Sequence, residues 1–90
     1  MVHYDIKITG RVQGVNFRAY TLQKAREHGI NGWVRNETDG SVRVNARGEE
    51  PDVNAFLGHL RSGPTLARVD KFIKHPVNSG TLVSGFSIRY

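Results

Sequence analysis

Residues 10–18, GRVQGVNFR, join a strand-like segment to a helix-like one and carry residue types that bind anions. The N-terminus of a helix offers unpaired backbone N–H groups and the positive end of the helix dipole. Gly14 lets the backbone curl so that successive N–H groups point inward, and Arg18 adds the planar, charged fork of a guanidinium. The stretch therefore predicts an anion site. An ordinary strand-to-helix turn with a solvated Arg18 is the alternative.

A second polar position, Asn36, ends the strand-like stretch GWVRN at residues 32–36, shortly before Asp39 and Gly40. An Asn at the end of a strand is commonly a turn former. Its amide, however, both accepts and donates hydrogen bonds, which suits the orientation of a water molecule. On the residues alone, both interpretations of Asn36 stay open.

Composition excludes several kinds of chemistry. The chain has no cysteine, which removes disulfides, thiolate metal sites and a cysteinyl-phosphate mechanism. Its four histidines are scattered, and no pair of acidic residues suggests a two-carboxylate hydrolase. The glycine spacing of residues 10–18 matches neither G-x-G-x-x-G nor the P-loop, which disfavours a nucleotide cradle. We therefore expect no metal and no cofactor.

The chain is basic, with 13 Lys and Arg against 8 Asp and Glu, for a formal net charge of +5. Because these cations form no run, we expect a solvated surface with a mild field for a small anionic substrate, and no nucleic-acid or membrane partner. No apolar run approaches the roughly 20 residues of a membrane span. The N-terminal MVHYDIKITG alternates polar and apolar residues, unlike a signal peptide. The expectation is a cytoplasmic monomer.

The length of 90 residues predicts a single domain, over residues 1–90. Alternation predicts strands at 4–12, 30–36, 41–47, 67–74 and 86–90, and helical spacing predicts helices at 17–28 and 51–61. Asp39 and Gly40 predict a tight hairpin between the second and third strands. In the fourth strand, Val69 and Ile73 are expected on one face and Phe72 on the other. The Ser/Gly-rich segment 78–85 is expected to be a mobile loop.

This order of elements predicts an α+β fold. Two βαβ units with right-handed crossovers place both helices on one face of an antiparallel sheet, which gives a ferredoxin-like βαββαβ sandwich. The architecture alone decides no function, because it is shared by enzymes, metal carriers and RNA-binding modules.

The motifs together resemble those of the acylphosphatase family, in the family's order and over nearly the whole chain. The matching segments are GRVQGVNFR at 10–18, GWVRN at 32–36, DGSV at 39–42, Gly48, SGP at 62–64 and the closing FSIRY. The resemblance implies a hydrolase that splits acyl phosphates into a carboxylate and inorganic phosphate. It also implies a phosphate cradle formed by the backbone of Gln13, Gly14, Val15, Asn16, Phe17 and Arg18. Arg18 would bind the phosphate by its side chain, and Asn36 would position the attacking water.

That reaction is consistent with the residues present. A carboxylate is a good leaving group, so no general acid is required at the departing oxygen. Phosphoryl transfer then needs mainly positioning and neutralisation of charge on the transferring oxygens. Two departures from the family's pattern concern surface charge and loop polarity: Arg43 and Arg47 in the third strand, where many relatives have an acidic residue at the first position, and Asn16 in a variable slot.

Two other interpretations remain. An RNA-binding module on the same fold would be favoured by the basic charge, but it needs aromatic residues on its central strands, and residues 41–47 have none. An accessory role is the other, because similar domains occur inside larger carbamoyl-transferring maturation proteins. The end of the chain at Tyr90 favours the free enzyme.

Overall fold

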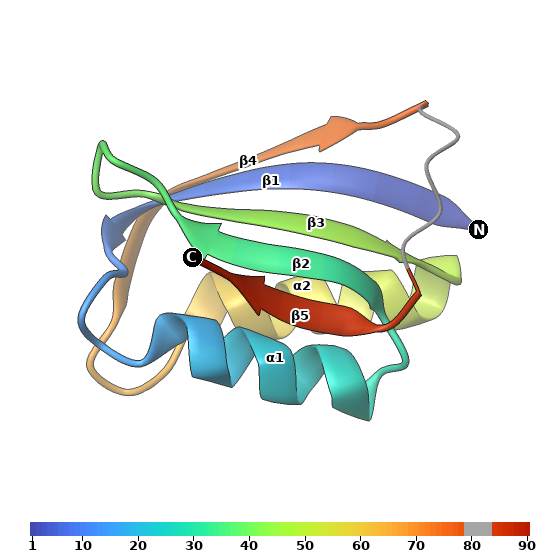
Figure 1. Ribbon diagram of the computed structural model, residues 1–90, viewed down its shortest axis with the longest axis horizontal. Helices are drawn as coiled ribbons and strands as arrows, with labels where there is room; N and C mark the ends of the chain where they lie inside the picture. Colours follow the sequence, from blue (N-terminus) through green and yellow to red (C-terminus); the bar gives the residue numbers. More distant parts are fainter. Residues whose placement is uncertain (79–83) are drawn as a thin grey trace.

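The computed structural model describes residues 1–78 and 84–90 (Figure 1). Its elements are β1 (Val2–Arg11), α1 (Phe17–Glu27), β2 (Asn31–Asn36), β3 (Val42–Gly48), α2 (Glu50–Ser62), β4 (Arg68–Pro76) and β5 (Phe86–Arg89). The predicted α+β class and order of elements are confirmed. Most of the segment 78–85, which was expected to be a loop, lies outside the described residues. Within the described ranges, no helix is long and apolar enough to cross a membrane.

The five strands form one sheet in the order β4-β1-β3-β2-β5. Both β1 and β2 pair antiparallel with β3, so they run in the same direction and α1 must cross over β3 to join them. In the same way, α2 joins β3 to β4 across β1. The predicted antiparallel sheet is therefore correct for these four strands.

The last strand makes the sheet mixed, because β5 pairs with β2 in parallel. The direction follows from the topology. β5 is antiparallel to β4, the strand that precedes it in the chain, and β2 is also antiparallel to β4. Placed beside β2, β5 must therefore be parallel to it.

The core lies between one face of the sheet and the two helices (Figure 1). Alternating strand residues supply the sheet side, as predicted: Ile6, Ile8, Val34, Val42, Val44 and Ala46 are all buried. From α2 come Val53, Phe56, Leu57 and Leu60 at the predicted helical spacing, and from α1 come Phe17, Thr21 and Ala25. Burying a large apolar side chain contributes roughly 1.5–3 kcal/mol. The core therefore fixes the ends of β1 and β2 against the start of α1.

The faces of β4 differ from the prediction. The pairing of β1 with β4 shifts between Thr9 and Gly10, which is a β-bulge. A β-bulge adds one residue to one strand of the pair, and this extra residue interrupts the alternation of side chains between the two faces of the sheet. Val69 and Phe72 therefore both pack against the core, while Ile73 is 44% exposed on the opposite face. The expectation that Val69 and Ile73 share a face was wrong.

Candidate active site

Arg18 and Asn36 meet in one pocket of about 290 Å³, at the end of the sheet where α1 begins. Arg18 lies in the first turn of α1, and Asn36 is the last residue of β2. The rest of the pocket wall comes from the loop before α1, the start of α1 and the C-terminus. These lining residues are Val12, Gly14, Asn16, Phe17, Ala19, Ile88 and Tyr90. The structure thus brings together the two predicted catalytic side chains.

The loop before α1 turns through two left-handed residues, Gly14 at φ 73° and Asn16 at φ 66°. Gly adopts this conformation freely, and Asn tolerates it better than most residues. Asn16 is also the N-cap of α1, yet its side chain makes no capping hydrogen bond, and the first turn of α1 holds no acidic residue. The first turn of α2, in contrast, holds Glu50 and Asp52. The positive end of α1 is therefore open to an external anion.

Arg18 is half-buried beside the C-terminal residue. Its guanidinium carbon lies 4.7 Å from the centroid of the Tyr90 ring, a cation–π distance. In the part of the chain that the structure describes, no carboxylate lies within ion-pair distance of Arg18. Its charge is consequently available to an anion in the pocket.

Asn36 does not act as the turn former of the β2–β3 hairpin. The turn is closed by Asp39, whose carboxylate accepts hydrogen bonds from the Ser41 backbone N–H at 2.9 Å and from the Ser41 hydroxyl at 2.5 Å. The side-chain oxygen of Asn36 is buried, and no group of residues 1–78 or 84–90 donates to it. A buried acceptor without a donor costs about 1–3 kcal/mol. Asn36 lines the Arg18 pocket and keeps an unpaired, buried side-chain oxygen, which favours a functional interpretation of Asn36.

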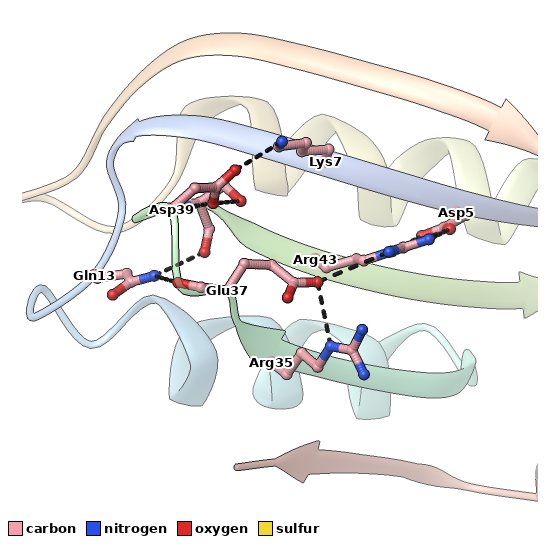
Figure 2. A network of polar contacts seen from close by, with 8 residues as sticks. Asp5, Lys7, Gln13, Arg35, Glu37, Asp39 and Arg43 are labelled. Atoms are coloured by element: carbon pink, nitrogen blue, oxygen red, sulfur yellow. Dashed lines mark hydrogen bonds and ion pairs between the residues drawn. The ribbon is translucent and has the colours of Figure 1, made fainter.

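Gln13 and Val15, which the family resemblance placed in the phosphate cradle by their backbone, do not line the pocket. The Gln13 side chain donates to the backbone carbonyls of Glu37 and Ser41, both at 2.8 Å (Figure 2). Val15 is buried in the core. The Gln13 side chain therefore links the loop to the hairpin that follows Asn36, and the Val15 side chain packs the loop onto the core.

Comparisons with known proteins show which family the chain matches. The family model described as acylphosphatase matches residues 4–88. The chain belongs to the acylphosphatase family. The acylphosphatase of Oceanobacillus iheyensis is 44% identical over 91 residues, which cover 100% of both chains. The crystal structure of acylphosphatase from Bacillus subtilis has a TM-score of 0.95 to this structure at 33% identity, again over 100% of both chains.

A longer protein contains a similar domain. The crystal structure of HypF from T. kodakarensis has a TM-score of 0.88 at 32% identity, and the match covers 100% of this chain but 12% of HypF. The matches to acylphosphatases, in contrast, span the relatives from end to end. The family and the hydrolase class predicted from the motifs are thus confirmed.

Four residues that line the pocket were not predicted from the sequence: Val12, Ala19, Ile88 and Tyr90. Val12 and Ala19 flank the predicted loop, whereas Ile88 and Tyr90 lie far from it in the sequence. The alternation in FSIRY indicated a strand, but its place beside β2 depends on pairing between distant segments. That pairing carries Tyr90 to Arg18. No local signal in the sequence contains this information.

A polar network lies on the opposite face of the sheet (Figure 2). Lys7 pairs with Asp39 at 2.8 Å, and this contact, together with the hydrogen bonds from Ser41, holds the pKa of Asp39 well below its usual range. Arg43 pairs with Asp5, which raises the pKa of Arg43. Arg43, one of the residues that depart from the family pattern, thus pairs with a carboxylate on the neighbouring strand. Across the described residues, no three His, Asp or Glu side chains gather in a group able to hold a metal ion.

Proposed function

We propose that this member of the acylphosphatase family hydrolyses the carboxyl–phosphate bond of acyl phosphates, releasing a carboxylate and inorganic phosphate. One observation supports the proposal above all. The uncapped N-terminus of α1, Arg18 and Asn36, whose buried side-chain oxygen has no donor among the described residues, line the same pocket. These are a positive cradle for a phosphate and an acceptor for a water molecule.

In the proposed mechanism, the phosphate is held by the Arg18 side chain and by backbone N–H groups of the loop residues that line the pocket, Gly14, Asn16, Phe17 and Arg18. The Asn36 amide oxygen accepts a hydrogen bond from a water and directs it at the phosphorus, opposite the leaving carboxylate. The water oxygen forms a bond to phosphorus while the bond from phosphorus to the carboxyl oxygen breaks. Both protons of the water end on the inorganic phosphate. The carboxylate leaves with the electron pair and needs no general acid.

One chain supplies both residues in the proposed roles, so we propose that the enzyme works as a monomer. Arg18 and the helix N-terminus supply positive charge at the phosphate, so we also propose that no cofactor is needed. The lack of cysteine fits a cytoplasmic location, where disulfides are not formed.

The direct test compares two substrates that share a phosphoryl group but differ in leaving group. Benzoyl phosphate should be hydrolysed, and inorganic phosphate should inhibit competitively because it occupies the same cradle. p-Nitrophenyl phosphate, whose leaving group is a weaker acid, should be turned over far more slowly. Equal rates on both substrates, or no hydrolysis of benzoyl phosphate, would contradict the proposal.

A further inference from the structure

A row of cations crosses the face of the sheet that the helices leave open. Arg89 on β5 pairs in register with Arg35 on β2, which pairs with Arg43 on β3, which in turn pairs with Lys7 on β1. The residues that alternate with them, such as Val34, point into the core. Adjacent strands lie about 4.8 Å apart, so this cationic row spans about 14 Å.

Like charges directly opposite each other on neighbouring strands destabilise a sheet. Carboxylates offset part of this cost, since Glu37 contacts Arg35 at 3.2 Å and Arg43 at 3.9 Å (Figure 2). Arg89 has no carboxylate within ion-pair distance among the described residues. The end of the cationic row at β5 is therefore uncompensated.

The whole open face keeps an excess of positive charge. By strand register and contacts, its cations are Lys7, Arg11, Arg35, Arg43, Arg47, Arg68, Lys71 and Arg89, and its carboxylates are Asp5, Glu37, Asp39 and Asp70. A partner with several negative charges would relieve the repulsion along the cationic row and gain affinity from it.

Trp33 adds an aromatic group at the β5 end of the row. The guanidinium carbons of Arg35 and Arg89 lie 4.9 and 4.8 Å from the centroid of the Trp33 ring. A guanidinium stacked on an aromatic ring keeps its N–H edges free to donate, and its planar surface can stack on a base. An acidic peptide would use the charges alone. A single-stranded nucleic acid would use both the charges and the planar groups.

We propose that the open sheet face binds single-stranded nucleic acid, with phosphates along the cationic row and a base stacked at Trp33, Arg35 and Arg89. The expectation of no nucleic-acid partner rested on cations that form no run in the sequence and on the lack of aromatics in residues 41–47. The sheet brings four of these cations into one row. Here the aromatic group comes from β2 instead. Asn36 lies on the other side of the same strand, so this surface is separate from the proposed hydrolytic pocket.

Trp33 is the only tryptophan of the chain, so its fluorescence reports directly on this face. A short oligothymidylate titrated into the full chain should quench it, with a Kd between about 10⁻⁴ and 10⁻⁶ M at physiological salt. For about three phosphate contacts, the slope of log K against log salt should be about −2. Absence of binding at low salt would overturn the proposal. Equal affinity for polyglutamate of matched charge would overturn the nucleic-acid assignment and indicate an acidic protein partner.

Matched variants locate the binding surface. Arg89→Ala, at an exposed position without an ion pair among the described residues, should weaken binding about three- to tenfold and reduce the salt slope by about 0.7–1. Trp33→Leu, followed by the anisotropy of a labelled oligonucleotide, should lose about tenfold in affinity with an unchanged salt slope. Arg26→Ala, exposed on α1, is the control and should bind as the wild type does.

The same oligonucleotide distinguishes this surface from the hydrolytic pocket. It should bind equally well when the pocket is saturated with inorganic phosphate. Loss of binding under that condition, or no effect of Arg89→Ala, would place the oligonucleotide in the Arg18 pocket and overturn the proposal. A failure to hydrolyse benzoyl phosphate would leave this result untouched, because fluorescence and anisotropy measure binding alone.

Discussion

The proposed role of Arg18 requires its side chain to contact both the Tyr90 ring and a bound phosphate. The Tyr90 ring lies 4.7 Å from its guanidinium carbon, and the proposed phosphate position lies at the N-terminus of α1 beside it. A guanidinium can stack its flat face on the ring while its edge donates two parallel hydrogen bonds to phosphate. An ammonium group has no flat face and acts as a point charge. The proposed role therefore requires a planar guanidinium and not only a positive charge.

Arg18→Lys tests this distinction. We expect kcat/KM for benzoyl phosphate to fall by at least about 10²-fold, the usual cost of removing one oxyanion donor, and inhibition by phosphate to weaken. Arg26→Lys, near the other end of α1, is the matched control and should leave both quantities unchanged. Near-normal turnover and normal phosphate inhibition in Arg18→Lys would show that Arg18 is only a surface residue.

The buried oxygen of Asn36 predicts a different kinetic signature from that of Arg18. Asn36→Ala should nearly abolish kcat while the Ki of phosphate stays within about twofold, because the proposed cradle and Arg18 remain. Asn54→Ala, exposed on α2, is the control. Folding of each variant is checked by circular dichroism. Full activity in Asn36→Ala would mean that the water has another partner.

Asn36→Asp is the sharper variant, because it nearly preserves size. A carboxylate can still accept a hydrogen bond from water, but it places a negative charge near the phosphate in a partly dry site, where screening is poor. It also loses the N–H donor of the amide. We expect low activity together with a raised Ki for phosphate, whereas Asn36→Ala should leave the Ki unchanged.

At the scale of elements, the site depends on how β1 ends. The bulge at Gly10 lets the strand approach β4 closely before the chain enters the loop. Gly10 has φ 132°, and a Cβ built there would lie 2.1 Å from the Arg68 carbonyl oxygen. No side chain fits this position without moving the backbone.

Gly10→Ala should therefore destabilise the fold by about 3 kcal/mol or more, through the clash and the strained backbone. Gly58→Ala is the matched control, because Gly58 lies in α2 with no atom within 4 Å of a built Cβ. Replacing a helical Gly by Ala should stabilise by up to about 1 kcal/mol. Urea unfolding measures whether the free energy of unfolding falls in Gly10→Ala and rises in Gly58→Ala. Equal stability of the Gly10 and Gly58 variants would contradict the close approach at the bulge.

The sequence could predict what depends on local patterns. The positions of Val42, Val44 and Ala46, and the loop from Gly14 to Arg18, follow from alternation and from a strand-to-helix junction. What escaped prediction depends on register between distant strands. The bulge moved Ile73 to the open face, and the pairing of β5 with β2 placed Tyr90 on Arg18. Pairing partners are chosen by the whole packed structure, so no window of sequence contains them.

At the scale of the molecule, the sheet separates two charged environments. On one side, the positive end of α1 and Arg18 line a pocket beside the core. On the other, a row of cations, partly offset by carboxylates, lies on an open surface (Figure 2). Among the described residues, only the first side brings a helix N-terminus, Arg18 and Asn36 together in one pocket. The fold thus gives the proposed hydrolysis one location, although positive charge is spread over the whole chain.

The proposed mechanism assigns all the neutralisation of phosphate charge to Arg18 and backbone N–H groups, so activity should not depend on an added ion. In phosphoryl transfer, metal ions commonly neutralise the developing charge, and a carboxylate leaving group lowers that demand. Extensive treatment with EDTA, followed by gel filtration into metal-free buffer, should leave kcat and KM for benzoyl phosphate unchanged. Adding Mg²⁺ or Zn²⁺ to the treated enzyme should give no increase. The Arg18→Lys variant, treated in parallel, shows whether a metal can substitute for the missing guanidinium. A large loss of wild-type activity on chelation that Mg²⁺ or Zn²⁺ restores would mean that an ion, and not Arg18 with the loop, carries the phosphate charge.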